Sequence, residues 1–163
     1  MKKLTTGLFI TAFVLLFAGN IQAQNISAGG GLVYSTDINN IGISLNGTYK
    51  YSEKIEIAPS FTYYLEKDYI TWKEFFVDGH YKFMKKEGMD IYAIAGVGIT
   101  VVTINWPDNW FGSDLSSSSS NFGINIGIGA KKNFGAFDVF AETKYNLSSS
   151  SHLSIGGGVL YRF

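Results

Sequence analysis

The sequence contains no cysteine and only two prolines among its 163 residues. Without cysteine, neither a disulfide framework nor a thiolate-bound metal site is available. Long apolar runs are also missing. The apolar segment at residues 8–18 is shorter than the ~20 residues that a membrane-spanning helix needs, and no later run approaches that length. Any part of this chain that spans a membrane is therefore expected to be a β-barrel.

The chain also lacks an excess of charge of either sign, with 13 basic and 13 acidic residues. The first 23 residues are typical of a cleaved secretory signal peptide, because Lys2 and Lys3 precede an apolar segment and the small residues Gly19 and Ala23 follow it. Cleavage would leave 11 basic residues against 13 acidic ones, a net charge of −2. This balance excludes the basic surface of a nucleic-acid-binding protein. Residues 24–163 are enough for one domain.

From Asn25 onward, hydrophobic and polar residues alternate with a period of two, which indicates β-strands. Ile43 and Leu45, for example, lie on one face of their segment, and Ser44 and Asn46 lie on the other. The fifth segment is apolar on both faces, so its phase stays open. The alternation predicts eight strands, at residues 25–35, 40–51, 54–66, 72–83, 90–104, 120–132, 136–147 and 152–163.

The connections between these strands alternate in length. Those at 51–54, 84–89 and 133–136 are short, whereas those at 66–71 and 105–119 are longer. Short periplasmic turns and longer external loops are typical of membrane barrels, and an even number of strands then places both termini on the periplasmic side. The serine run at 116–120 is expected to be a mobile loop tip.

The polar faces of the strands carry charges of both signs, which suits the narrow interior of an eight-stranded barrel. The register predicts Lys50 opposite Glu56 and Lys131 facing Asp138. Solvated faces of a soluble exported β-sandwich or barrel would also carry such residues, and this alternative stays open. The expected interior charge network comprises Lys50, Glu56, Glu74, Asp78, His80, Lys82, Lys131, Asp138, Glu142, Lys144 and Arg162.

Aromatic residues gather at both ends of the expected strands, as they do at the two interfaces of a membrane. The periplasmic group is Tyr49, Tyr51, Phe83, Phe134, Phe137, Tyr161 and Phe163, and the opposite group is Tyr34, Tyr63, Tyr69, Trp72, Trp106, Trp110 and Tyr145. Glycine triplets at 29–31 and 156–158 occupy the middle of the first and last strands, where a closing seam requires close backbone approach.

With its signal peptide, eight alternating strands, aromatic girdles and terminal Tyr161-Arg162-Phe163, the chain resembles the small OmpA/OmpX-type, porin-like family of bacterial outer-membrane β-barrels. The resemblance implies an all-β fold, an eight-stranded antiparallel up-and-down transmembrane β-barrel in the outer membrane. It also implies lipid and lipopolysaccharide as surroundings, a monomer, and a C-terminal assembly signal at Tyr161 and Phe163 for the barrel-assembly machinery. The family includes structural anchors, adhesion or defence proteins and a few lipid-modifying enzymes.

The residues provide little chemistry for an enzyme. Neither histidine lies in a metal-binding spacing, and no phosphate-binding glycine motif occurs, so we expect no metal and no cofactor. His152 and Ser154 resemble the catalytic pair of outer-membrane lipid A deacylases, but both share the inward phase. We therefore expect no enzyme activity, with a lipid A-modifying enzyme as the alternative. Recognition or adhesion is expected in loop 105–119, through Trp106, Trp110 and Phe111.

Overall fold

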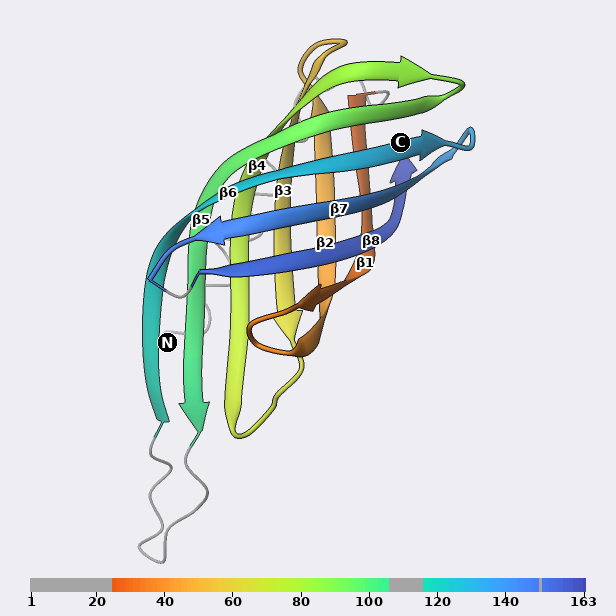
Figure 1. The fold of residues 1–163 in the computed structure, drawn as a ribbon. Coiled ribbons are helices and arrows are strands. Elements are labelled where there is room, and N and C mark those ends of the chain that lie inside the picture. Colours follow the sequence, from red (N-terminus) through yellow and green to blue (C-terminus); the bar gives the residue numbers. More distant parts are fainter. Residues whose placement is uncertain (1–24, 106–115, 150) are drawn as a thin grey trace, which may run out of the picture.

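The computed structural model describes residues 25–105, 116–149 and 151–163. The expected signal peptide at residues 1–23 therefore lies outside the described residues. Eight antiparallel strands pair in chain order, and the last strand pairs with the first to close a barrel (Figure 1). The strands are β1 (Ile26–Ser35), β2 (Asn40–Lys50), β3 (Ile55–Tyr64), β4 (Ile70–Lys86), β5 (Met89–Asn105), β6 (Ser116–Asn133), β7 (Phe137–Leu147) and β8 (His152–Arg162).

Glycine forms the seam between β1 and β8. Gly31 is paired with Gly158, so the two glycine triplets lie side by side. A Cβ atom on Gly31 would lie 2.3 Å from the Gly157 carbonyl oxygen, and one on Gly158 would lie 2.3 Å from the Gly30 carbonyl oxygen. The backbones are thus closer here than any larger residue allows, which confirms the expected close approach at the seam.

Alternate residues of every strand point to opposite sides of the barrel wall. In β2, Ser44 is buried whereas Ile43 and Leu45 are 54% and 63% exposed. The pairing with β4 and β6 also fixes the phase of β5: Tyr92, Ile94 and Thr100 face inward and are buried.

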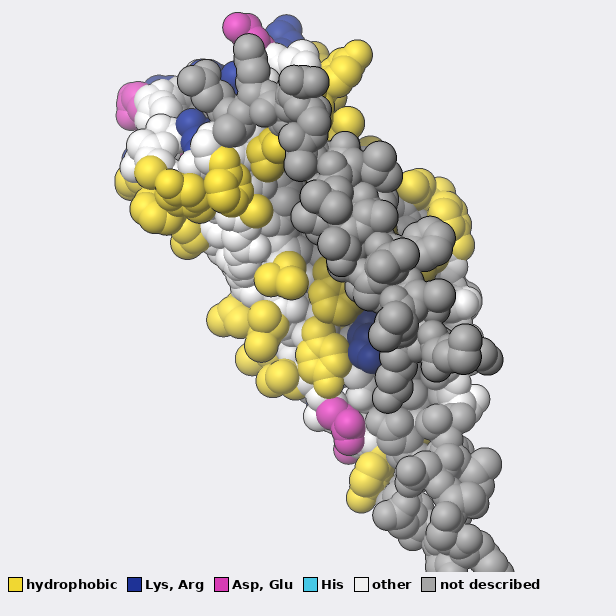
Figure 2. All heavy atoms as spheres, turned by 180° about the vertical axis from the view of Figure 1, so that it is seen from behind, with side chains coloured by type: hydrophobic (Ala, Val, Ile, Leu, Met, Phe, Trp, Pro, Cys, Tyr) yellow, Lys and Arg dark blue, Asp and Glu magenta, His cyan; other side chains and the backbone are white. Residues whose placement is uncertain are grey.

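The outer wall carries the hydrophobic side chains. On the described part of the face seen in Figure 2, hydrophobic side chains lie in patches along the wall, and charged side chains are most frequent at its upper end. Exposed aliphatic residues include Leu45 on β2, Val97 on β5, Ile126 on β6 and Ile155 on β8, so the apolar surface surrounds the barrel. A water-soluble barrel would place these residues inside.

The strands have unequal lengths, and β4, β5 and β6 are the longest. Pairing between β5 and β6 continues to Asn105 and Ser116, whereas pairing between β6 and β7 stops at Ile124 and Leu147. The β5–β6 ribbon therefore extends beyond its neighbour, as Figure 1 shows. The expectation of a loop tip at 116–120 was wrong, because these serines are part of β6 and pair with β5. Backbone hydrogen bonds between strands do not require hydrophobic side chains, so a serine run can form them.

The β3–β4 connection is also tighter than the sequence suggested. Lys67 and Ile70 exchange both backbone hydrogen bonds, at 3.1 and 2.9 Å. Asp68 and Tyr69 between them have φ values of 53° and 62°, the left-handed conformation of a two-residue hairpin turn. Neither residue is glycine, so this turn lacks the usual sequence signal of a two-residue hairpin.

In the described parts of the chain, no helix is long and apolar enough to cross a membrane.

Candidate functional site: the charged barrel interior

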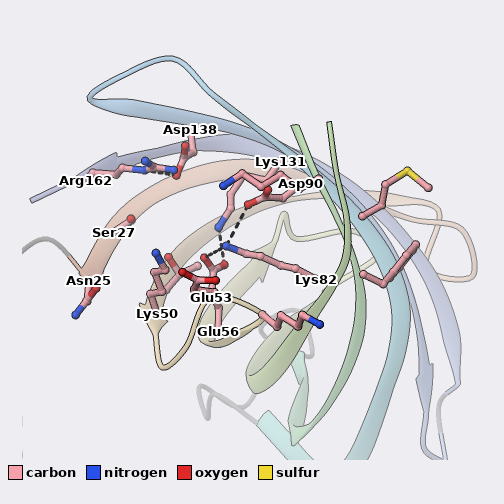
Figure 3. A pocket seen from close by; sticks show the side chains of 15 residues that line it. Asn25, Ser27, Lys50, Glu53, Glu56, Lys82, Asp90, Lys131, Asp138 and Arg162 are labelled. Atoms are coloured by element: carbon pink, nitrogen blue, oxygen red, sulfur yellow. Dashed lines mark hydrogen bonds and ion pairs between the residues drawn. The ribbon is translucent and has the colours of Figure 1, made fainter. Parts of the chain in front are cut away.

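Three groups of polar side chains follow one another along the inside of the barrel. The first lies near the end where β1 begins and β8 ends, and it is centred on Glu56 of β3 (Figure 3). Glu56 places one carboxylate oxygen 2.5 Å from Lys82 Nζ and the other 2.5 Å from Lys131 Nζ. Lys82 also contacts Asp90 at 3.1 Å. Two lysines, one from β4 and one from β6, therefore share one buried carboxylate.

The second group lies deeper, around Asp78 and Glu142. Lys144 Nζ lies 3.2 Å from Asp78 and 3.4 Å from Glu142, so it connects the two carboxylates. Tyr92 donates a hydrogen bond of 2.8 Å to Glu142, and its ring stacks on His80 at 4.5 Å. Gly96 provides the space for Asp78, since a Cβ atom there would lie 2.1 Å from the carboxylate.

The third group lies toward the opposite end, around Glu74. Its carboxylate accepts hydrogen bonds of 3.3 Å from Tyr64 and Thr100, and it lies 3.0 Å from His152 Nε2. The Trp72 ring meets the His152 ring edge-on at 6.4 Å between centroids. All these side chains come from β3, β4, β5 and β8.

The structure places the predicted interior residues as follows. Glu56, Glu74, Asp78, His80, Lys82, Lys131, Glu142 and Lys144 belong to the three groups, and Asp138 pairs with half-exposed Arg162 at 2.7 Å. Lys50 is exposed at the end of β2. It is opposite Glu56 in the register, as expected, but makes no ion pair among the described residues.

Two expectations about side-chain placement were wrong. Lys131 is paired with Phe140, not with Asp138, because the β6–β7 turn aligns Asn133 with Asp138. Trp72 was expected in the outer aromatic girdle, yet it contacts His152 inside the barrel. Trp72 and Glu74 are two residues apart, so the period of two could have assigned Trp72 to the inner face with Glu74. Trp106, Trp110 and Phe111 lie outside the described residues.

The polar groups fill most of the interior. Between the first group and the opposite end, described residues line two small cavities of about 20 and 30 Å³. These spaces are small beside the side chains that line them, so the described interior leaves no wide channel. A larger cavity, of about 430 Å³, lies at the end that contains the first group.

His152 and Ser154 both face the interior and are buried. Glu74 provides the carboxylate next to His152, so three residue types of a hydrolytic triad are close together. The Ser154 hydroxyl, however, donates to the Lys144 carbonyl oxygen at 3.3 Å. The pair also faces away from lipid. Within the described residues, no group of three metal-ligating side chains is present.

One acidic residue outside the barrel wall connects a loop to a strand. Asp37, between β1 and β2, accepts hydrogen bonds from the Leu153 backbone N–H at 3.1 Å and the Thr36 hydroxyl at 3.0 Å. These bonds lower the pKa of the Asp37 carboxyl, and the bond from Leu153 has the larger effect. The ionised side chain thus holds the β1–β2 connection against the start of β8.

The fold and the apolar outer wall define a transmembrane β-barrel of the small outer-membrane type. No family model matches the sequence, and the search of curated proteins found no match. The N-terminal barrel of OprF from Pseudomonas aeruginosa is similar in structure, with a TM-score of 0.63 and 19% identity over 86% of this chain and 98% of that one.

Two further barrels share the fold. Ail, the attachment invasion locus protein of Yersinia pestis, has a TM-score of 0.59 at 21% identity, covering 85% of this chain and 96% of that one. Neisserial surface protein A has a TM-score of 0.61 at 14% identity, with the same coverage. Identities this low show the fold alone, so the activity of this chain has to be argued from its own residues.

Proposed function

We propose that this protein is a non-enzymatic component of the bacterial outer membrane, closed to general diffusion, with recognition placed in the loop that joins β5 and β6. The observation that carries this proposal is the reversed distribution of side chains. Hydrophobic residues surround the outside of the barrel, and most of the buried residues inside it are polar or charged, with ion pairs among them. Such a barrel is stable in lipid and leaves no wide path through its centre.

The geometry of the β5–β6 ribbon supports recognition at its tip. The ribbon extends beyond β7, so Asn105 and Ser116, the residues that flank 106–115, lie beyond the last pair between β6 and β7. Three aromatic residues, Trp106, Trp110 and Phe111, lie in this segment, and aromatic side chains are frequent in binding surfaces. Ail, which shares the fold, has a structure in complex with the heparin analogue sucrose octasulfate.

The lipid A deacylase alternative is less well supported. An enzyme that acts on a membrane lipid must present its nucleophile to the lipid, whereas His152 and Ser154 are buried in the interior. A change in lipid A acylation after His152→Ala or Ser154→Ala would favour the enzyme.

The first test compares full-length protein with a loop-deletion variant, in which the two-residue turn Asn-Gly replaces residues 106–115. Both are expected to fractionate with the outer membrane and to migrate faster on gels before heating than after, because the deletion leaves every paired strand intact. Only the full-length protein is expected to attach cells to immobilised sulfated glycans. A matched double variant, Trp110→Ala with Phe111→Ala, should behave like the deletion. Recovery of the full-length protein as a soluble periplasmic monomer would contradict the membrane proposal, and unchanged attachment by the deletion variant would contradict the loop proposal.

The second test measures conductance. Purified protein in planar bilayers is expected to show no stable, large, ohmic current, since eight strands enclose little space and the inner cavities have volumes of only about 20 and 30 Å³. The control is a general-diffusion porin reconstituted in the same way. A stable large conductance from the pure protein would show that the ion-paired interior is open in the membrane.

A further inference from the structure

The end of the barrel that contains the first polar group is hollow. Its cavity of about 430 Å³, here called the vestibule, is within the size range of small-ligand sites. Glu56, Lys82 and Lys131 form one side, and Asp138 and Arg162 lie on another (Figure 3). None of the functions proposed above uses this space.

Positive charge is in excess in the vestibule. Six basic and four acidic residues line it. Lys82, Lys131 and Arg162 are paired with Glu56, Asp90 and Asp138. The remaining basic residues are Lys50, Lys54 and Lys85, and the remaining acid is Glu53; within the described part of the chain these four form no ion pair.

An unbalanced charge of this kind attracts anions, and the low-dielectric walls of a cleft strengthen the attraction. The three free lysines come from three different segments: the end of β2, the β2–β3 turn and the end of β4. They therefore line the part of the opening that is formed by the neighbouring strands β2, β3 and β4.

Neutral hydrogen-bond donors also face the vestibule. Ser27 of β1 and Thr48 of β2 are directly opposite each other in the register. Both are buried at 8% exposure, and neither hydroxyl bonds to another described residue. Asn25 lies next to them in the same lining. Buried hydroxyls are normally hydrogen-bonded, so these two are available to a ligand or to water.

We propose that the vestibule binds a phosphate group. A phosphate has more acceptor oxygens and more negative charge than a carboxylate, which suits three lysines and two hydroxyls around one cavity. Lysine binds phosphate as a compact point charge, so it needs no fixed two-pronged geometry. The phosphate could belong to a free anion such as pyrophosphate or to a lipid headgroup in the adjoining leaflet. The proposal does not depend on the recognition loop.

The test uses the full chain refolded in an uncharged maltoside detergent and titrated with inorganic pyrophosphate by calorimetry. Saturable binding is expected. It should weaken by about tenfold or more in the triple variant Lys50→Gln, Lys54→Gln, Lys85→Gln, because charge-assisted hydrogen bonds are lost. The matched control is Lys67→Gln, Lys73→Gln, Lys132→Gln, which removes the same charge outside the vestibule and should leave the affinity unchanged.

A second variant keeps the charge and removes the hydroxyls. Ser27→Ala with Thr48→Val should also weaken pyrophosphate binding if the anion enters the cavity, and it should have no effect if the anion only touches surface lysines. Heat-modifiable gel mobility shows that each variant is folded. Absence of saturable binding by the parent protein, equal loss in both triple variants, or full affinity in the hydroxyl variant would each overturn the proposal.

The same titration distinguishes the two sources of phosphate. Phosphatidic acid added to the micelles is expected to weaken the apparent affinity for pyrophosphate if a lipid headgroup reaches the vestibule. An unchanged affinity would identify a free anion as the ligand. Both results support a phosphate site.

Discussion

Replacing Glu56 with glutamine is expected to lower the free energy of unfolding by about 3–5 kcal/mol, because it leaves two buried lysines without their shared carboxylate. Glu56 is 5% exposed, and each of its oxygens lies 2.5 Å from a lysine Nζ. After the substitution, Lys82 retains Asp90 at 3.1 Å, but Lys131 has no other ion pair in the described structure. Reversible urea unfolding in lipid vesicles measures the loss.

Two further variants show whether the cause is the unpaired charge. Glu53→Gln removes a nearby acid that forms no ion pair with any described residue, and it should change the stability by less than about 0.5 kcal/mol. Lys131→Met in the Glu56→Gln background should restore part of the lost stability, because it removes the charge that lacks a partner. If Glu56→Gln costs no more than Glu53→Gln, the ion pairs do not stabilise the barrel.

An arginine at Leu45 is expected to cost about 2–4 kcal/mol when the protein is unfolded reversibly in lipid, because it places a charge near the middle of the bilayer. Leu45 is 63% exposed on the outer wall. It lies midway along β2 between Ile41, which pairs with the girdle residue Tyr34, and the girdle residue Tyr49.

The control for this prediction changes depth and keeps the residue type. Tyr51→Arg places the same charge just beyond β2 at the barrel end, where it reaches water, and should cost about 0–1 kcal/mol. The contrast between the two sites is the evidence for the position of the bilayer. Equal penalties at Leu45 and Tyr51 would show that the apolar wall does not face a hydrocarbon layer.

The strands and their inner and outer faces could be predicted from the sequence alone. The side-chain period of a strand is a local property of the backbone, so alternation in β2, β6, β7 and β8 identifies each strand and assigns its faces. The glycine triplets could also be interpreted from the sequence alone. They mark the closing seam because no other residue permits such a close approach of two backbones. The sequence failed in β5, where both faces are apolar and glycine is frequent. Only pairing with β4 and β6 fixed the phase there.

The partners of the interior charges were decided by the tertiary structure. Glu56 and Lys131 are 75 positions apart in the chain and belong to strands that are not neighbours in the sheet. Their contact depends on how the closed barrel curves, and this curvature cannot be derived from the register of any single hairpin. The mistaken pairing of Lys131 with Asp138 has a local origin: a shift of the β6–β7 turn by two residues changes the opposite residue and keeps the face. Local alternation thus determines what points inward, and closure of the sheet determines what meets there.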